Sequence, residues 1–144
     1  MAIASPRSQA TKHGPVFQGS IHEGIPVQDA DASLKFYTEV LGLKVLPRPS
    51  VIGPGYWLAD DRDTVQFHLI QTDKQYRPGP EAKISPTGRH TAWLVQDLEV
   101  FRQHLRQLGI DWQELPAGAI VPSAQLFIKD PDGHTWEFQE PPKQ

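Results

Sequence analysis

Apolar and polar residues follow the same sequence of patterns in the two halves of the chain. Alternation over residues 17–27 and again over residues 88–96 predicts a β-strand at the start of each half, because strand side chains point alternately to two faces. Each strand is followed by a segment with apolar residues at broadly helical spacing, residues 34–41 and 98–108. The pattern therefore predicts one helix in each half, directly after the first strand.

The ends of both helices are marked by residues with capping chemistry. Asp29 or Asp31 can begin the first helix, and Asp97 can begin the second, by accepting backbone N–H bonds. Gly42 and Gly109 follow the last apolar positions and supply the permissive backbone that ends a helix. Three short strands are then expected in each half, at about 43–48, 55–60 and 64–71, and at about 110–115, 123–129 and 134–139.

Each half thus has the predicted order βαβββ, with a hairpin turn at Asp130-Pro131-Asp132-Gly133 before the last strand. The expected fold class is α+β, with two βαβββ modules pairing into a cup-shaped mixed sheet. A half of this size would be marginal alone, so we expect one shared core. The expected boundaries are an N-terminal tail 1–16 and a single domain 17–140, divided into modules 17–71 and 87–140 and a connector 72–86.

The repeat also places metal-ligand chemistry at matching positions. His22 and His90 each stand four residues before Val-Gln-Asp, while His68 and Glu137 lie in the middle of the last strand of their halves. Each is expected on the strand face opposite the main apolar set, so curled sheets could bring all four together. Three imidazoles and one carboxylate suit Zn, Fe, Ni, Co or Mn better than Ca or Mg, which prefer oxygen ligands.

Other titratable residues are weaker candidates. His13 lies in the expected tail, and His104 is expected to face solvent from the second helix. His134 follows the turn glycine and is either a surface turn residue or a lid group near the site. Glu23 should point to the strand face opposite that of the neighbouring histidine, which argues against a role as a ligand.

Composition excludes several classes of function. There is no cysteine, which removes disulfides, thiolate metal sites and cysteine nucleophiles. The 14 Lys and Arg residues are balanced by 17 Asp and Glu residues, and no basic patch predicts a nucleic-acid partner. No apolar run approaches the roughly 18 residues of a membrane span. The N-terminus lacks an apolar signal core, so a cytoplasmic protein is expected.

Over about residues 17–140 the chain resembles the vicinal oxygen chelate superfamily, which includes glyoxalase I, extradiol dioxygenases, methylmalonyl-CoA epimerase, fosfomycin-resistance enzymes and bleomycin-binding proteins. The resemblance is carried by His22 with Ile25-Pro26-Val27-Gln28-Asp29, Phe36-Tyr37 with Leu41-Gly42-Leu43, His90 with Val95-Gln96-Asp97, and the turn 130–133 with Glu137. It implies one divalent metal held at the positions of His22, His90 and Glu137, with His68 as a fourth position. It also implies a small-molecule substrate bound through neighbouring oxygens.

The subfamilies differ at the fourth position. Glyoxalase I usually has a carboxylate where this chain has His68, and its metal-bound glutamates shuttle protons; only Glu137 remains here for that role. Extradiol dioxygenases use two histidines and one carboxylate, which would match His22, His90 and Glu137 and make His68 a pocket group. Bleomycin-binding relatives lack the ligands, which argues against simple sequestration.

The resemblance favours a metal-dependent, glyoxalase I-like lyase or isomerase in which Glu137 is both ligand and general base. A one-domain extradiol-type dioxygenase and a metal-retaining binding or resistance protein without turnover are the alternatives. Relatives often pair modules across a two-fold axis. We therefore predict a homodimer in which His22 and His68 of one chain meet His90 and Glu137 of the other; the competing arrangement closes both modules of one chain into one cup.

Overall fold

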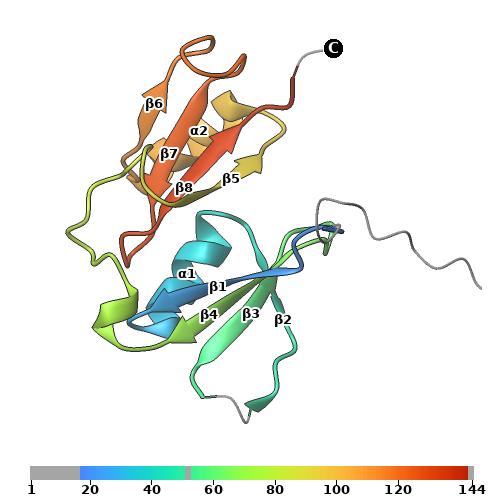
Figure 1. Cartoon of the computed structure of the whole chain (residues 1–144), viewed down its shortest axis with the longest axis vertical. Helices are drawn as coiled ribbons and strands as arrows, with labels where there is room; N and C mark the ends of the chain where they lie inside the picture. Colours follow the sequence, from blue (N-terminus) through green and yellow to red (C-terminus); the bar gives the residue numbers. More distant parts are fainter. Residues whose placement is uncertain (1–16, 51–52, 143–144) are drawn as a thin grey trace, which may run out of the picture.

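The computed structural model describes residues 17–50 and 53–142, and the two halves fold as modules of the same topology (Figure 1). The first contains β1 (His22–Val27), α1 (Ala30–Glu39), β2 (Lys44–Leu46), β3 (Gly55–Ala59) and β4 (Gln66–Gln71). The second contains β5 (His90–Leu94), α2 (Leu98–Leu108), β6 (Gln113–Leu115), β7 (Gln125–Lys129) and β8 (Thr135–Gln139). A 3-10 turn, η2 (Lys74–Tyr76), lies in the connector. The predicted tail 1–16, with His13, lies outside the described residues.

Each module is a four-stranded mixed sheet, with strand orders β1-β4-β3-β2 and β5-β8-β7-β6. The first strand of a module is parallel to its last strand, and the remaining pairs are antiparallel. A helix crossover joins the first strand to the rest of each sheet. The predicted α+β class and the repeated βαβββ order are confirmed. No helix in the described part of the chain is long and apolar enough to cross a membrane.

Local chemistry begins and ends the helices largely as predicted. The side chain of Asp29 accepts two backbone N–H bonds at the start of α1, each 3.0 Å, so it is the cap rather than Asp31. Asp97 accepts two equivalent bonds at 2.8 and 3.0 Å at the start of α2. Gly109 ends α2 with a φ of 66°, a left-handed conformation that costs glycine little. Gly42, with a φ of 69°, follows α1 in the same way.

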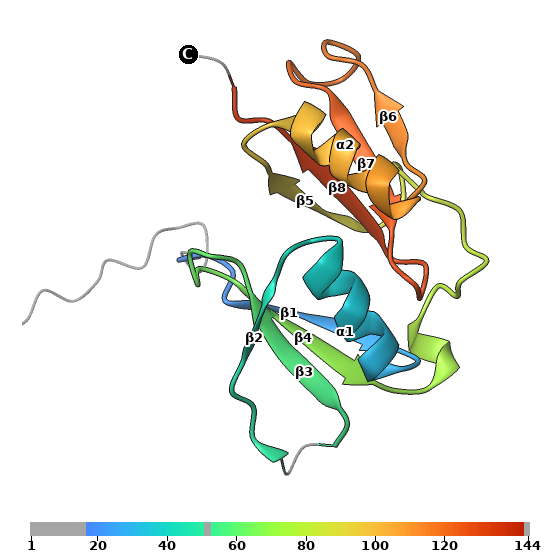
Figure 2. The same cartoon turned by 180° about the vertical axis from the view of Figure 1, so that it is seen from behind.

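The helix-bearing faces of the two sheets share one hydrophobic core. The ring of Phe67 on β4 lies 4.5 Å from the ring of Trp93 on β5 and 6.2 Å from that of Trp136 on β8. Tyr37 of α1 makes an edge contact with Trp136 at 5.7 Å. Figures 1 and 2 show α1 between its own sheet and the second module. Buried residues of both modules therefore form a single cluster, as the small size of each half led us to expect.

The first strand begins later than predicted. β1 starts at His22, whose partner in the register is Gln66, the first residue of β4. Among the described residues before His22, 17–21, the one backbone bond to the sheet runs from the N–H of Gln66 to the carbonyl of Ile21. Ile21, an apolar residue within the predicted strand segment 17–27, lies outside β1 and is 77% exposed, so the predicted start of the strand was wrong. The tertiary structure sets the start of β1, because a strand extends only as far as the strand that pairs with it.

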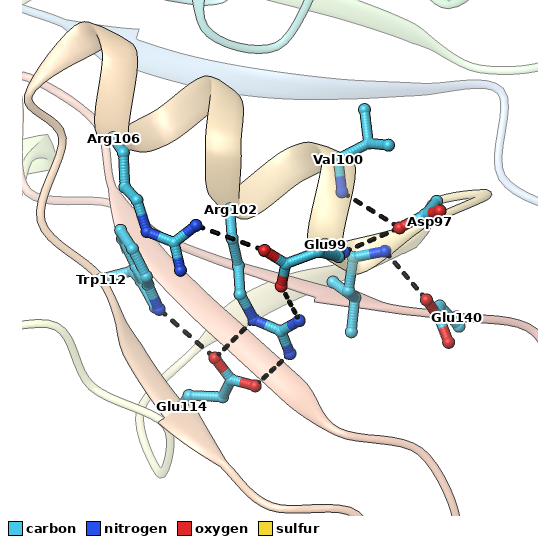
Figure 3. Close-up of polar contacts among 9 residues, drawn as sticks. Asp97, Glu99, Val100, Arg102, Arg106, Trp112, Glu114 and Glu140 are labelled. Atoms are coloured by element: carbon cyan, nitrogen blue, oxygen red, sulfur yellow. Dashed lines mark hydrogen bonds and ion pairs between the residues drawn. The ribbon is translucent and has the colours of Figure 1, made fainter.

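A charged network on the outer face of α2 fastens the short strand β6 (Figure 3). The guanidinium of Arg102 bonds Glu99 at 3.0 Å and also Glu114 of β6, and these carboxylates raise the pKa of Arg102. Arg106 bonds the same Glu99 at 3.3 Å and lies 5.6 Å over the ring of Trp112. Partly exposed ion pairs contribute little individually. These bonds join α2 to an edge strand, and their partners among the described residues include none of the predicted metal ligands.

Candidate metal centre

The strand registers place the predicted ligands at equivalent positions in the two modules. Between the parallel strands β1 and β4, His68 lies opposite Gly24, two residues beyond His22. Between β5 and β8, Glu137 lies opposite Ala92, two residues beyond His90. Residues two apart on a strand project from the same face, so each module presents one pair of side chains from its first and last strands.

The pair in the second module has the chemistry of a metal half-site. His90 Nε2 lies 2.7 Å from Oε2 of Glu137, and His90 Nδ1 lies 2.8 Å from the carbonyl oxygen of Gly88. A carbonyl can only accept, so Nδ1 carries a proton and Nε2 is the nitrogen directed at the carboxylate. Metal-binding histidines are commonly oriented in this way through their second nitrogen. The Glu137 side chain is 4% exposed and that of His90 is 23% exposed.

Two glutamines hold the other oxygen of Glu137, and the sequence analysis missed both. Gln125 and Gln139 each donate an amide N–H to Oε1 at 2.6 Å. One signal was present in the sequence, because Gln139 stands two residues after Glu137 and therefore shares its strand face. Gln125 comes from the neighbouring strand β7, and its contact depends on the register between two strands.

The pair in the first module is an aromatic stack. The rings of His22 and His68 are nearly parallel, with centroids 4.4 Å apart, and the ring of Trp57 stacks on His68 at 4.6 Å. His68 Nε2 lies 3.0 Å from the side-chain oxygen of Gln66.

Burial of His68 lowers its pKa, and the positive charges of His22 and Arg48 lower it further. A lowered pKa means that the folded protein favours the neutral ring. The contribution of neutral His68 to the free energy of unfolding is fully present above the pKa of histidine in the unfolded chain, about 6.5. It is lost as the pH falls through the lower pKa of the folded protein. We therefore expect the free energy of unfolding of metal-free protein to fall less between about pH 7.5 and 5.5 in His68→Gln than in wild type. Urea unfolding at the two pH values measures this difference. The same pH dependence in variant and wild type would contradict this.

The two pairs do not come together within one chain. Among residues 17–50 and 53–142, no group of three or more histidine, aspartate or glutamate side chains is placed to hold one ion. The reason is that the opposite faces of the two sheets pack against each other. Phe67 and Trp93 point into the shared core, so the alternating residues His68 and His90 project from the opposite faces. The donor chemistry fits a divalent ion, but each module supplies only two of the four predicted ligands.

Three other titratable side chains link the modules. His104 was predicted to face solvent, but this was wrong: its Nε2 lies 3.0 and 3.1 Å from two carbonyls at the C-terminal end of α1, where a helix leaves such groups unpaired. His134 is held against β1, with Nε2 2.7 Å from the carbonyl oxygen of Pro26. Glu23 points away from the ligand face, as predicted, and accepts a hydrogen bond from the hydroxyl of Thr91 at 2.7 Å.

Two buried carboxylates of the turn between β7 and β8 fix the modules relative to each other. Asp130 accepts a 2.5 Å hydrogen bond from the hydroxyl of Tyr37, and burial raises the pKa of both groups. Asp132 accepts from the hydroxyl of Ser33 at 3.2 Å and pairs with Arg77 of the connector at 3.0 Å. The turn predicted from the sequence therefore also serves as the joint between the modules.

A cavity of about 1030 Å³ lies where β1, the connector and the first residues of β5 and β8 meet. It is lined by one member of each ligand pair, His22 and His90, and by His134. Its volume is at the upper end of the usual range for small-molecule sites, roughly 300–1,000 Å³. Of the four predicted ligands, His22 and His90 line this cavity, and His68 and Glu137 are not among its lining residues.

The repeat, the paired ligands and the cavity define a class of protein, and comparison with known sequences identifies it. The profile of the glyoxalase/bleomycin resistance protein/dioxygenase superfamily matches residues 19–138. The chain belongs to this superfamily.

Its sequence relatives include plant proteins named as a glyoxylase I and a lactoylglutathione lyase. It is 27% identical over 119 residues to glyoxylase I 4 of Arabidopsis thaliana, covering 81% of this chain and 67% of the relative. It is 29% identical over 127 residues to a lactoylglutathione lyase of the same plant, covering 82% of this chain and 42% of the relative. The chain therefore spans less than half the length of that lyase.

Solved structures share the fold at low sequence identity. A lactoylglutathione lyase from Agrobacterium tumefaciens superposes with a TM-score of 0.60 at 20% identity, covering 87% of this chain and 95% of that protein. TnmS3, an antibiotic-binding protein from Streptomyces sp. CB03234, superposes with a TM-score of 0.68 at 20% identity, covering 89% and 99%. One fold thus supports different functions, and the choice between them depends on the site.

Proposed function

We propose that this chain is a divalent-metal-dependent, glyoxalase I-like lyase or isomerase acting on a small substrate chelated through neighbouring oxygens. The observation that carries the proposal is the His90–Glu137 pair, a buried carboxylate facing a histidine whose tautomer is fixed by the carbonyl of Gly88. The matching position of the His22–His68 pair supports a second half-site. The relatives named as glyoxalase I and lactoylglutathione lyase support the reaction class.

The proposed ligands are His90 Nε2, Glu137 Oε2, His22 and His68. Imidazoles with one carboxylate suit an ion of the Zn, Fe, Ni, Co or Mn group. Such an ion, when bound, stabilises negative charge on the neighbouring oxygens of a substrate by acting as a Lewis acid.

In this proposal Glu137 moves the proton. Its Oε1 accepts from two amide donors, so Oε2, the oxygen that faces His90, is the one proposed to act as general base. Oε2 accepts the proton from a substrate carbon next to a carbonyl, and the electron pair of that C–H bond shifts toward the carbonyl oxygen. Oε2 then returns the proton to the former carbonyl carbon, while the hydroxyl proton of the first carbon passes to the former carbonyl oxygen and a carbonyl forms at the first carbon. The isomerisation is balanced, because no proton or electron is gained or lost overall.

We also propose that the site is shared between two chains. The helix-bearing faces of both modules are packed against each other, and the ligand-bearing faces are left outside that core. Ile70 and Leu94, on the same faces as His68 and His90, are 47% and 67% exposed. Apolar side chains beside a candidate site favour cover by another surface. A second copy that places its first module against the second module here would bring all four ligands together.

Metal analysis combined with an activity assay tests the proposal. We expect the protein to retain a divalent ion and, once loaded, to isomerise the hemithioacetal of a 2-oxoaldehyde without consuming oxygen. Treatment with a chelator should abolish turnover, and the metal should restore it. A loaded protein that holds its metal but turns over neither this substrate nor a catechol would be a metal-retaining binder, and the proposed reaction would be wrong.

One observation favours a second candidate, an extradiol-type dioxygenase. The ring of His68 lies between two other rings and its Nε2 faces Gln66, which leaves His22, His90 and Glu137 as a set of two histidines and one carboxylate. That set, with open positions, is typical of non-haem iron oxygenases. Iron in the purified protein and oxygen uptake with a catechol would support the dioxygenase over the lyase.

A further inference from the structure

The two oxygens of Glu137 have different surroundings. Oε1 accepts amide N–H bonds from both Gln125 and Gln139, each at 2.6 Å. Within the described part of the chain, the hydrogen-bond partner of Oε2 is Nε2 of His90, at 2.7 Å. An ionised carboxylate buried to this degree is costly unless hydrogen-bond donors compensate it. The two amides supply that compensation on one side of the group and leave the other side for a ligand.

The chain also fixes which way the amides point. The hydroxyl of Ser123 donates to the side-chain oxygen of Gln139 at 3.0 Å, so the NH₂ end of that amide is directed at Glu137. Gln125 is buried, and its strand register places it on the same sheet face as the carboxylate, because Phe127 is the direct partner of Glu137. The positions of both amide donors therefore follow from the strands that carry them.

The first module shows that these donors are not required by the fold. His68 occupies the position of Glu137, and its partner Trp57 occupies the position of Phe127. Counting two residues along each strand places Gly55 at the position of Gln125 and Ile70 at the position of Gln139. Neither has a side-chain donor. At these two pairs of equivalent positions, the amide donors thus belong to the module whose ligand candidate is a carboxylate.

We infer that Gln125 and Gln139 are positioning residues that reserve Oε1 of Glu137 and present Oε2 as the single ligating oxygen. The inference rests on the proposed function, since it assumes that Glu137 binds the metal. Without the two amides the carboxylate could rotate and offer either or both oxygens. Substituting a residue that hydrogen-bonds a metal ligand typically lowers metal affinity about 10- to 100-fold.

Zinc binding by the full chain tests the inference. Gln125→Met and Gln139→Met keep similar side-chain volume but lose the donor. Each is expected to weaken Zn²⁺ binding about 10- to 100-fold in competition with a chromophoric chelator. Gln113→Met is the matched control, because Gln113 is an exposed glutamine on the neighbouring strand β6 and makes no hydrogen bond to Glu137 in the described structure. It should bind as tightly as wild type.

The hydroxyl of Ser123 gives a test of orientation. Ser123→Ala should weaken Zn²⁺ binding through Gln139, whereas Ser123→Thr, which keeps the hydroxyl, should restore it.

Infrared difference spectra of zinc binding supply a second readout: the separation of the carboxylate bands should change from a one-oxygen to a two-oxygen pattern in the methionine variants. A role confined to stability would lower the unfolding midpoint without changing these bands.

The possible failures are distinguishable. If wild type binds zinc and both methionine variants bind it equally tightly with unchanged bands, the positioning role is wrong and the proposed function stands. If wild type binds no divalent metal, the proposed function fails and the inference fails with it. If circular dichroism shows that Gln125→Met does not fold, the less buried Gln139→Met and the two Ser123 variants decide the question in the same way.

Discussion

Replacing His90 with alanine is expected to remove most of the bound divalent ion while leaving the fold intact. His90 supplies the proposed ligand Nε2, and its side chain lies outside the hydrophobic core. Losing a residue that only hydrogen-bonds a ligand lowers metal affinity about 10- to 100-fold. Losing a ligand itself should therefore lower metal affinity at least about 100-fold. Elemental analysis gives metal per chain, and circular dichroism reports folding. His104→Ala, altering a histidine outside the site, should retain metal. A folded His90→Ala variant with full metal content would contradict the assignment.

The same variant distinguishes a shared site from one built by each chain. If the site is shared, a dimer of one His90→Ala chain and one His22→Ala chain contains one unaltered four-ligand site and one doubly altered site. Metal content and activity should therefore reappear when the two inactive variants are unfolded, mixed and refolded together. The control is each variant carried through the procedure alone. If mixed dimers form, as shown by two affinity tags, and neither metal nor activity returns, each chain builds its own site.

Replacing Asp132 with alanine should destabilise the protein by about 3–5 kcal/mol, the typical cost of removing one partner of a buried ion pair. Arg77 and Asp132 have side chains only 7% and 4% exposed, so the substitution leaves the guanidinium buried without its carboxylate. The bond from the hydroxyl of Ser33 is lost as well. Urea unfolding measures the change in free energy.

Two matched variants accompany this prediction. Asp61→Ala removes an exposed aspartate from the β3–β4 connection and should change stability by less than about 0.5 kcal/mol. The double variant Arg77→Met with Asp132→Leu removes both charges and should be less destabilised than Asp132→Ala, because no charge is left unpaired. A free energy of unfolding for Asp132→Ala within about 1 kcal/mol of wild type would show that the turn does not fasten the modules.

The sequence by itself determined the features that depend on neighbours along the chain. Asp29 and Asp97 cap helices because a carboxylate can reach the N–H groups of the next turn, whatever the rest of the fold does. Gly109 ends a helix for an equally local reason. The alternation of side chains placed His68 and Glu137 on the face opposite the apolar residues, and the repeat showed that their positions correspond. The family and its fold class followed from this arrangement.

Only the tertiary structure decided what those faces meet. Local alternation says that a strand has two faces, but packing alone determined that the faces carrying Phe67 and Trp93 join in one core and leave the ligand faces outside. The amide of Gln125 reaches Glu137 through the register of two strands, which no local pattern records. His104 looked like a surface residue of an isolated helix and instead meets the end of another one. These contacts depend on distances between segments far apart in the chain, and such distances are fixed only when the whole core packs.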